Sequence, residues 1–159
     1  MTPKQTIHLS KLNDTASVSA IYALIQNTIS QSYSPVYPSR AVEYFQRMYS
    51  AEKILANSSE GLTLMAKLGD TVVGTGTAIN DEISGVFVSN SHQGCGIGSK
   101  IMKRLELSIA QAGKSSVSLS VSLPAVKFYK GLGYEGFEEM SIDVGEGQTL
   151  DYWMATKSI

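Results

Sequence analysis

The sequence predicts an α/β fold on a mixed central sheet, and two features support this class. Hydrophobic patterns follow one another as strand, helices, three strands, helix, strand, helix and two strands. An amphipathic helix that joins two apolar strands requires those strands to be parallel, whereas short turns make neighbouring strands antiparallel. The length of 159 residues and the 43% hydrophobic content suit one folded domain. We therefore expect a single domain over residues 1–159, with about six or seven strands and about four helices.

The N-terminal part is predicted to be mainly helical. Residues 7–9 are a candidate short strand. Asn13 or Asp14 can cap a helix over residues 18–29, where apolar side chains recur at three- and four-residue spacing. A turn-rich segment with two prolines follows, and Ser39 can then cap a second helix.

Strands dominate the middle of the chain. After a shorter helical piece at 52–56, residues 62–68 and 71–79 flank Gly69-Asp70, which predicts a hairpin with a tight turn. Residues 83–88 read as a third strand. This region therefore supplies three consecutive antiparallel strands.

The C-terminal part alternates helices and strands. Apolar residues lie one turn apart over 97–109, which predicts a long amphipathic helix. A strand over 117–121 follows, and Ser122 can cap a short helix. Residues 134–144 and 148–156 are expected to be the last two strands.

Charge and cysteine content exclude several classes of protein. The net charge is −1, and the nearest approach to a basic stripe is Lys100, Lys103 and Arg104, so we expect no nucleic-acid partner. Cys95 is the one cysteine, which gives no sign of a secreted disulfide framework. The first ten residues lack a signal-peptide core, and no apolar run approaches the ~18 residues of a membrane span. We expect a cytoplasmic protein without a membrane partner.

The most informative segment is the glycine loop at residues 93–99, which lies between a strand and a long helix. Glycines at 94, 96 and 98 allow several backbone N–H groups to point at one place. The free N–H groups and the dipole of the helix start favour an anion there. No acidic side chain occurs between Ile97 and Arg104. The pattern predicts a phosphate site, and a glycine-rich turn without a ligand stays open as the alternative.

Two other phosphate motifs do not fit the loop. The nucleoside triphosphatase pattern G-x-x-x-x-G-K-[ST] is absent, because Lys100 follows Ser99. The dinucleotide pattern G-x-G-x-x-G fails because Gly94 and Gly96 are followed by Ser99.

Taken with its surroundings, this loop resembles motif A of the GNAT superfamily (Gcn5-related N-acetyltransferases), [QR]-x-x-G-x-[GA], as Gln93, Gly96 and Gly98. Residues 82–88 look like the fourth strand of that family. Residues 124–134 look like its motif B, A-x-x-F-Y-x-x-x-G-[FY]. The resemblance is specific between about residues 82 and 137 and weakens to element order in the N-terminal half.

This resemblance implies a GNAT-like fold with splayed fourth and fifth strands and acetyl-CoA as cosubstrate. Backbone N–H groups of residues 94–99 would hold the pyrophosphate, and the strand at 86–88 would pair with the pantetheine arm. An amine would attack the thioester directly, a backbone N–H near Val88 would stabilise the oxyanion, and Tyr129 would protonate the thiolate. The implied cosubstrate-binding residues are Val86, Phe87, Val88, Gln93, Gly94, Cys95, Gly96, Ile97, Gly98, Ser99, Ser122, Phe128 and Tyr129.

Some positions depart from the family pattern or are ambiguous. Ser122 stands where the family often has Asn, and Asn90 stands where it commonly has Pro. Glu82 is the candidate general base, although an edge carboxylate in solvent is the alternative. Period-2 counting groups Glu82 with Ser84, Val86 and Val88, opposite Ile83 and Phe87, and a bulge in this strand would reverse that grouping. Tyr129 also has a purely structural reading, as a core aromatic on an apolar helix face.

The family position of several aromatic residues suggests an acceptor pocket. The predicted residues are Tyr33, Tyr37, Tyr44 and Trp153, together with Tyr152, and the alternative is that they only fill the core. Cys95 is interpreted as a backbone donor rather than a nucleophile. His8 and His92 lack metal-ligand spacing, so no metal is predicted.

The sequence therefore predicts an acetyl-CoA-dependent N-acetyltransferase whose primary amine acceptor is undefined. The acceptor could be a small amine, an amino acid, an antibiotic or a peptide N-terminus. A non-enzymatic acyl-CoA-binding regulatory module is the rival function, and a longer acyl-CoA stays open as cosubstrate. A homodimer through the last strands is compatible with the family resemblance.

Overall fold

A computed structural model describes residues 6–159, so residues 1–5 of the expected domain lie outside the described residues. The helices are α1 (Thr15–Thr28), α2 (Ser39–Met48), α3 (Ala51–Glu60), α4 (Ile97–Gln111) and α5 (Val126–Gly131). A π-helical turn, η1 (Ile29–Tyr33), continues α1, and 3-10 turns form η2 (Asn90–His92) and η3 (Leu123–Ala125). The strands are β1 (Ile7–Lys11), β2 (Leu62–Leu68), β3 (Thr71–Ile79), β4 (Glu82–Val88), β5 (Ser116–Ser122), β6 (Glu135–Gly145) and β7 (Gln148–Ser158).

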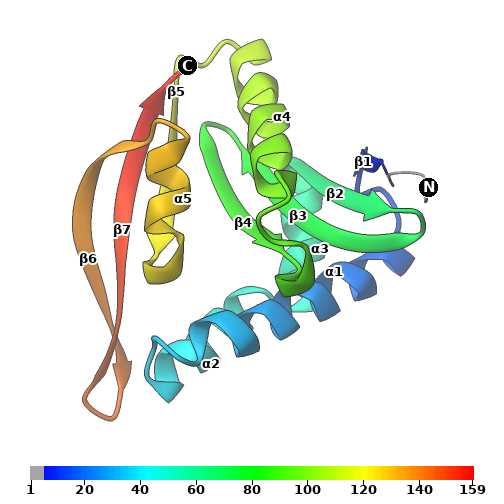
Figure 1. Cartoon of the computed structure of the whole chain (residues 1–159). Coiled ribbons are helices and arrows are strands. Elements are labelled where there is room, and N and C mark those ends of the chain that lie inside the picture. The colour runs from blue at the N-terminus through cyan, green and yellow to red at the C-terminus, as the bar shows by residue number, and fades with distance from the viewer. Residues whose placement is uncertain (1–5) are drawn as a thin grey trace.

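These strands form one seven-stranded sheet in the order β1-β2-β3-β4-β5-β7-β6 (Figure 1). The β4 and β5 strands are parallel, and the other neighbouring pairs are antiparallel. The crossover helix α4 accounts for the parallel pair, and tight turns account for the hairpins. The predicted α/β fold with a mixed sheet is confirmed.

Local sequence signals set most helix starts. The carboxylate of Asp14 accepts a hydrogen bond from the N–H of Ser17 over 2.7 Å, as expected for an N-cap. The expectation for Ser39 was wrong, because Pro38 occupies the N-cap and Ser39 is the first helical residue. Pro38 has no side-chain acceptor for the first turn, and the N–H of Arg40 instead donates to Oε1 of Gln148 over 2.8 Å.

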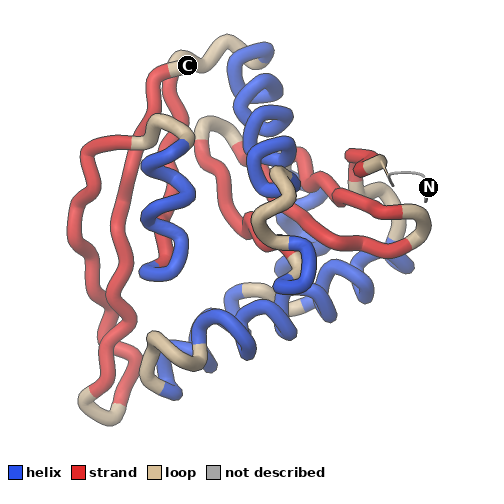
Figure 2. The backbone as a smooth tube through the Cα atoms, in the orientation of Figure 1, coloured by secondary structure: helices blue, strands red, loops and turns tan. Residues whose placement is uncertain are grey.

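Helices cover both faces of the sheet (Figures 1 and 2). On one face α4 packs on β3 and β4 while α5 packs on β5, above a core that includes Ile101, Leu105 and Val121. On the other face α1 packs on β3 and β4, with Ile21 and Ile25 in a second core. Burying each such aliphatic side chain contributes roughly 1.5–3 kcal/mol, so these two cores fix the sheet between its layers.

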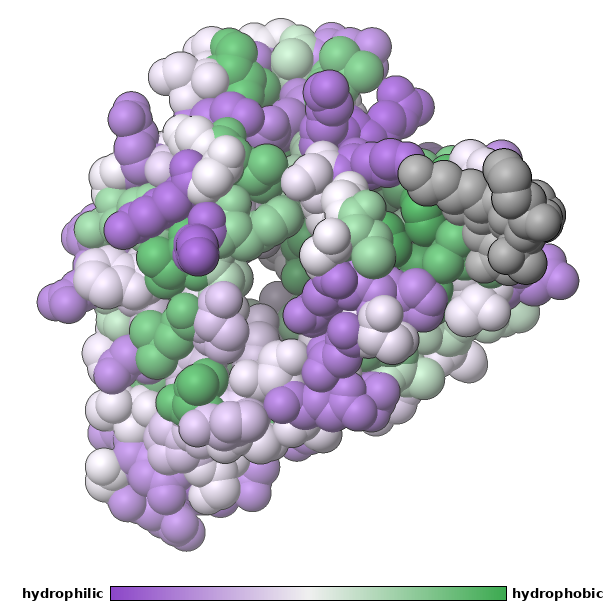
Figure 3. Space-filling model, in the orientation of Figure 1, coloured by the Kyte–Doolittle hydropathy of each residue, from purple (hydrophilic) through white to green (hydrophobic). Residues whose placement is uncertain are grey.

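The sheet opens where β4 and β5 meet. In the described part of the chain their register consists of one residue pair, Glu82 with Ser118, and the N–H of Ser118 also donates to the carbonyl of Asp81 over 3.0 Å. Beyond this point the two strands diverge, and the space-filling surface is hollowed between the β4 side and the α5 side (Figure 3). The expected splay of the fourth and fifth strands is thereby confirmed.

A bulge bends β4 within this opening. Thr77 pairs with Ser84 but Thr75 pairs with Phe87, so β4 carries one residue more than β3 over this stretch. Gly85 adopts φ +63°, a conformation that side chains rarely accept. As a result Phe87 joins the core under α1 and α2, on the opposite face from Val86.

Candidate active site

The glycine loop leads directly into α4. Gly94 and Gly96 have φ of 79° and 81°, and Gly96 is the N-cap residue. The first helical hydrogen bond of α4 runs from the N–H of Lys100 to the carbonyl of Gly96 over 3.1 Å. Among residues 6–159 no acceptor is found for the N–H groups of Ile97, Gly98 and Ser99, as expected for the first turn of a helix. These donors and the helix dipole make the loop an anion site.

Side chains anchor the loop to the end of β4. The amide of Gln93 donates to the carbonyl of Val88 over 3.1 Å and to Oδ1 of Asn90 over 3.2 Å. The hydroxyl of Ser32 in η1 donates to the same Asn90 oxygen over 3.1 Å. Asn90 therefore tethers the loop through hydrogen bonds, at the position where the resembled family commonly has a proline.

The start of α4 also packs closely against α5. A Cβ atom added at Gly98 would lie 3.0 Å from Cζ of Phe128 and 3.6 Å from Cγ2 of Val88. Only glycine leaves room for this approach without movement of the aromatic ring. The third glycine of the loop is thus required by packing, whereas Gly94 and Gly96 are required by their backbone angles.

A cavity of about 450 Å³ lies against the glycine loop, β4 and α5. Its lining includes twelve of the predicted cosubstrate-binding residues: Val86, Phe87, Val88, Gln93, Gly94, Gly96, Ile97, Gly98, Ser99, Ser122, Phe128 and Tyr129. Cys95 is exposed and is not part of this lining. The lining also includes residues that sequence reasoning did not assign to the cosubstrate site, because their approach depends on how α1, η1, η2 and η3 fold around the loop. These residues are Thr28, Ser32, His92, Pro124 and Ala125.

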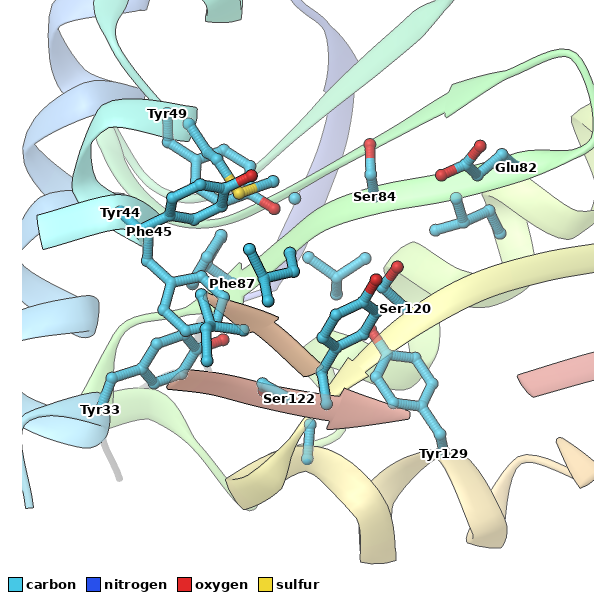
Figure 4. Close-up of a pocket in the computed structure, with 18 residues that line it drawn as sticks. Tyr33, Tyr44, Phe45, Tyr49, Glu82, Ser84, Phe87, Ser120, Ser122 and Tyr129 are labelled. Atoms are coloured by element: carbon cyan, nitrogen blue, oxygen red, sulfur yellow. The ribbon is translucent and has the colours of Figure 1, made fainter. Parts of the chain in front are cut away.

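A second cavity, of about 330 Å³, lies on the other side of the β4–β5 opening (Figure 4). It is enclosed by α2, η1, β4, β5, α5 and the β6–β7 hairpin. The two cavities share the residues at their junction: Tyr33, Val86, Phe87, Ser122, Ala125 and Tyr129. A ligand in the glycine-loop cavity and a ligand in the second cavity would therefore meet beside the bulge of β4.

The sequence profile of the acetyltransferase (GNAT) domain matches residues 30–145. The chain belongs to the GNAT acetyltransferase family. The match runs from within η1 to the end of β6 and includes most of the lining of both cavities. It confirms the family resemblance found in the two sequence motifs and identifies the protein as an N-acetyltransferase.

Solved GNAT structures share this fold. A GCN5-related N-acetyltransferase from Rhodopseudomonas palustris has a TM-score of 0.87 at 22% identity, with 100% of this chain and 99% of that chain covered. The PaiA N-acetyltransferase from Thermoplasma acidophilum, solved with coenzyme A, has a TM-score of 0.74 at 18% identity, covering 97% and 99%. YncA of Salmonella typhimurium, solved with acetyl-CoA, has a TM-score of 0.66 at 18% identity, covering 96% and 93%. No curated protein sequence matches the chain.

Tyr129 stands at the junction of the two GNAT cavities. Its side chain is 7% exposed, and its ring packs edge-on against Phe128 and Tyr134. Burial raises the pKa of the Tyr129 hydroxyl far above its usual range, so the group stays protonated at neutral pH. Among the described residues no hydrogen bond of this hydroxyl is found, and Tyr129 lines both cavities. A protonated donor is therefore available at the junction.

The strand β4 contributes both side chains and backbone to the GNAT site. The N–H of Ser89 donates to the carbonyl of Val73 over 2.9 Å, so the strand alternation turns the N–H of Val88 away from β3 and toward the opening. Val86 and Val88 pack toward the α4 core, while Glu82 and Ser84 line the second cavity. The simple period-2 grouping of Glu82 with Val86 and Val88 was wrong, because the bulge reverses the alternation.

The predicted acceptor aromatics divide into two groups. Tyr33 and Tyr44 line the second cavity, as does Tyr152. Tyr37 and Trp153 are not among the residues that line this cavity.

Tyr37 and Trp153 have other roles in the structure. The Tyr37 hydroxyl donates to the carbonyl of Asp151 over 2.8 Å and accepts from the N–H of Leu123 over 2.9 Å. Trp153 lies next to Tyr152 on β7, so its side chain takes the opposite face, where it packs against Phe137 at 6.4 Å between ring centroids. Sequence reasoning missed the lining residues Phe45, Met48, Tyr49, Ser84, Ser120, Ile142 and Leu150.

No helix in the described range 6–159 has both the length and the apolar character needed to cross a membrane.

Proposed function

We propose that this chain binds acetyl-CoA in the glycine-loop cavity and transfers the acetyl group directly to a primary amine that occupies the second cavity. The observation that carries the proposal is the junction of the two cavities at Tyr129 and the β4 bulge. A direct transfer needs both reactants at one point, and separate cavities that meet there supply the required proximity.

Backbone groups of α4 and β4 support the proposed acetyl-CoA site. The first-turn N–H groups of α4 suit a pyrophosphate, since they carry no competing acidic side chain. Beyond Glu82 the edge of β4 that faces β5 is open, so a pantetheine arm can add to it like another strand. PaiA and YncA, which share the fold, were solved with coenzyme A and acetyl-CoA respectively.

The transfer step uses groups at the junction. The amine nitrogen forms a bond to the thioester carbonyl carbon, and the N–H of Val88 stabilises the negative charge that develops on the carbonyl oxygen. As the C–S bond breaks, the Tyr129 hydroxyl gives its proton to the sulfur. The attacking nitrogen loses a proton as it becomes an amide, and this proton returns to the Tyr129 oxygen. The products are therefore an amide and a free thiol.

The ammonium form of the amine must first lose a proton. Glu82 is the carboxylate of the second cavity, and Ser84 and Ser120 line the same space on the facing strands β4 and β5 (Figure 4). A proton can pass to Glu82 directly or through water held by these hydroxyls. Glu82 is therefore proposed as the general base.

The first test is calorimetric titration of the purified chain with acetyl-CoA, with free CoA and ATP as controls. We expect binding of acetyl-CoA and CoA but not of ATP, because the loop lacks the nucleoside triphosphate motif. Thiol release on addition of primary amines then reports transfer. Absence of binding to either form of coenzyme A would contradict the proposal, whereas binding without turnover for any amine would favour the regulatory module.

A further inference from the structure

The second cavity has an unusual charge pattern. Within the described part of the chain it is lined by 18 residues, and Glu82 is the one side chain among them that carries a charge at neutral pH. No Lys, Arg or His lines it. The remaining lining combines serine hydroxyls with apolar and aromatic side chains, namely Tyr33, Tyr44, Phe45, Met48, Tyr49, Phe87, Ile142, Leu150 and Tyr152.

Two arginines, Arg40 and Arg47, belong to α2, which forms one side of the cavity, and neither is a lining residue. Arg47 is exposed. Arg40 is engaged in ion pairs. Its guanidinium pairs with Glu43 at 3.4 Å and with Glu146 at 3.9 Å. A carboxylate that entered the cavity would therefore meet Glu82 and no cation. Burial of such an unpaired negative charge is strongly unfavourable.

One end of the cavity is closed by contacts between the start of α2 and the β6–β7 hairpin. The N–H of Arg40 donates to Oε1 of Gln148 over 2.8 Å. The Tyr37 hydroxyl donates to the carbonyl of Asp151 over 2.8 Å. These bonds join α2 and the segment before it to the β6–β7 hairpin on this side of the cavity, which restricts the space for an extended peptide. The closure favours a small acceptor.

Given the proposed acetyl transfer, we infer that the acceptor is a small aralkyl primary amine that bears no carboxylate and no second charged amine. Its ammonium group is attracted by Glu82, and its apolar body packs against the aromatic wall. A carboxylate would be repelled by the same Glu82. A second ammonium would be buried without a counter-ion, because the lining holds a single carboxylate. The chemistry of the cavity thus separates simple amines from amino acids, peptides and polyamines.

Matched acceptors test this inference. Initial rates of thiol release from acetyl-CoA are measured with phenethylamine against phenylalanine, tryptamine against tryptophan, and spermidine. We expect kcat/KM for each amine to exceed that of its α-carboxyl partner by at least about tenfold, and to exceed that of spermidine. Equal rates within the pairs, or a preference for the amino acids or spermidine, would overturn the inference.

Binding measurements separate this inference from the proposed function. Phenethylamine is titrated into the chain saturated with CoA, and phenylalanine is the control ligand. Binding of CoA without any binding of phenethylamine would overturn the acceptor class alone. Failure to bind CoA or acetyl-CoA would overturn the proposed function and the inference together.

A variant that adds a positive charge to the cavity is tested by its preference between two acceptors, a ratio that partial loss of folded protein would not change. Met48 lines the cavity at the end of α2 and is 38% exposed, so Met48→Lys places a cation there without burying it. We expect the preference for phenethylamine over phenylalanine to narrow by at least about threefold. The matched control is Leu55→Lys on α3, which is 43% exposed and outside both cavities, and it should keep the preference of the original chain. An unchanged preference in Met48→Lys would overturn the charge argument.

Discussion

The hydroxyl of Tyr37 donates to the carbonyl of Asp151 over 2.8 Å and so ties the segment before α2 to β7. The same oxygen accepts from the N–H of Leu123 in η3 over 2.9 Å. One side chain thereby connects three elements around the acceptor cavity. Its position is structural, and it accounts for the absence of Tyr37 from the cavity wall.

Replacing Tyr37 by Phe removes both hydrogen bonds and keeps the ring. Because a part-buried carbonyl and a part-buried amide N–H lose their partner, we expect the free energy of unfolding to fall by about 1–3 kcal/mol. Urea denaturation measures the change. Tyr22→Phe is the matched control, since Tyr22 is 41% exposed, and its stability should stay within about 0.5 kcal/mol of the original chain. Equal stability of the two variants would contradict the role of Tyr37.

Gly98→Ala tests the packing of the glycine loop. The added methyl group would lie 3.0 Å from Cζ of Phe128, so the start of α4 or the aromatic ring must shift. We expect acetyl-CoA binding to weaken roughly tenfold, because a displaced first turn no longer aligns its N–H groups. Calorimetry measures the affinity. Gly131→Ala in α5 meets no atom within 4 Å and should bind acetyl-CoA normally. If both variants bind equally well, the close approach at Gly98 is not needed for the cosubstrate site.

The sequence predicted the parts of this site that depend on local spacing. The glycine loop, the amphipathic face of α4 and the position of Tyr129 on α5 all follow from residues within one or two turns of each other. The motif residues Gln93 and Gly98 both line the cavity that borders α4. Local patterns thus identified most of the residues that line the glycine-loop cavity.

The acceptor side depends on long-range packing and was predicted only in part. Tyr152 and Trp153 are adjacent, so they take opposite faces of β7, and the sequence contains no signal for which face meets the cavity. The bulge at Gly85 likewise reverses the alternation of β4 at a single residue. Ser84 and Ser120 reach the cavity only because β4 and β5 diverge, which is a property of the assembled sheet.

Tyr129→Phe tests the proposed proton donor. The ring stays packed while the thiolate loses its acid, so kcat should fall on the order of 100-fold and acetyl-CoA affinity should change little. Steady-state rates and calorimetry measure the two quantities separately. An unchanged kcat would remove Tyr129 from the transfer step. A parallel loss of kcat and affinity would instead indicate a binding role.

Alkaline pH is expected to destabilise the fold through its buried tyrosines. Burial raises the pKa of Tyr37 from its usual value of about 10 to about 12. Between these values the unfolded chain loses the tyrosine proton while the folded chain keeps it, so stability is fully present below pH 10 and falls as pH rises toward 12. The contribution of Tyr37 is about 1.4 kcal/mol per pH unit at most.

Urea denaturation at pH 9, 10 and 11 measures this dependence. The Tyr37→Phe variant lacks the titrating group, so its stability should fall less steeply above pH 10 than that of the original chain. Lysines and the other tyrosines titrate in both proteins, so their contributions to the pH dependence of stability cancel in the comparison. Identical slopes of the free energy of unfolding against pH in the two proteins would contradict the raised pKa of Tyr37.

Glu82→Gln tests the proposed general base. The amide keeps the size of the side chain but takes no proton, so kcat with phenethylamine at neutral pH should fall by about 100-fold. Acetyl-CoA affinity should be retained, because Glu82 lines the acceptor cavity and not the glycine-loop cavity. The deficit should shrink as pH rises, since a growing fraction of the free amine arrives already neutral and needs no base. Rate profiles between pH 7 and 9.5 measure this convergence, with Glu139→Gln on the exposed strand β6 as a control that should match the original chain. A deficit in kcat that stays constant with pH would contradict the role of Glu82 as general base, because an amine that arrives neutral has no proton for Glu82 to remove.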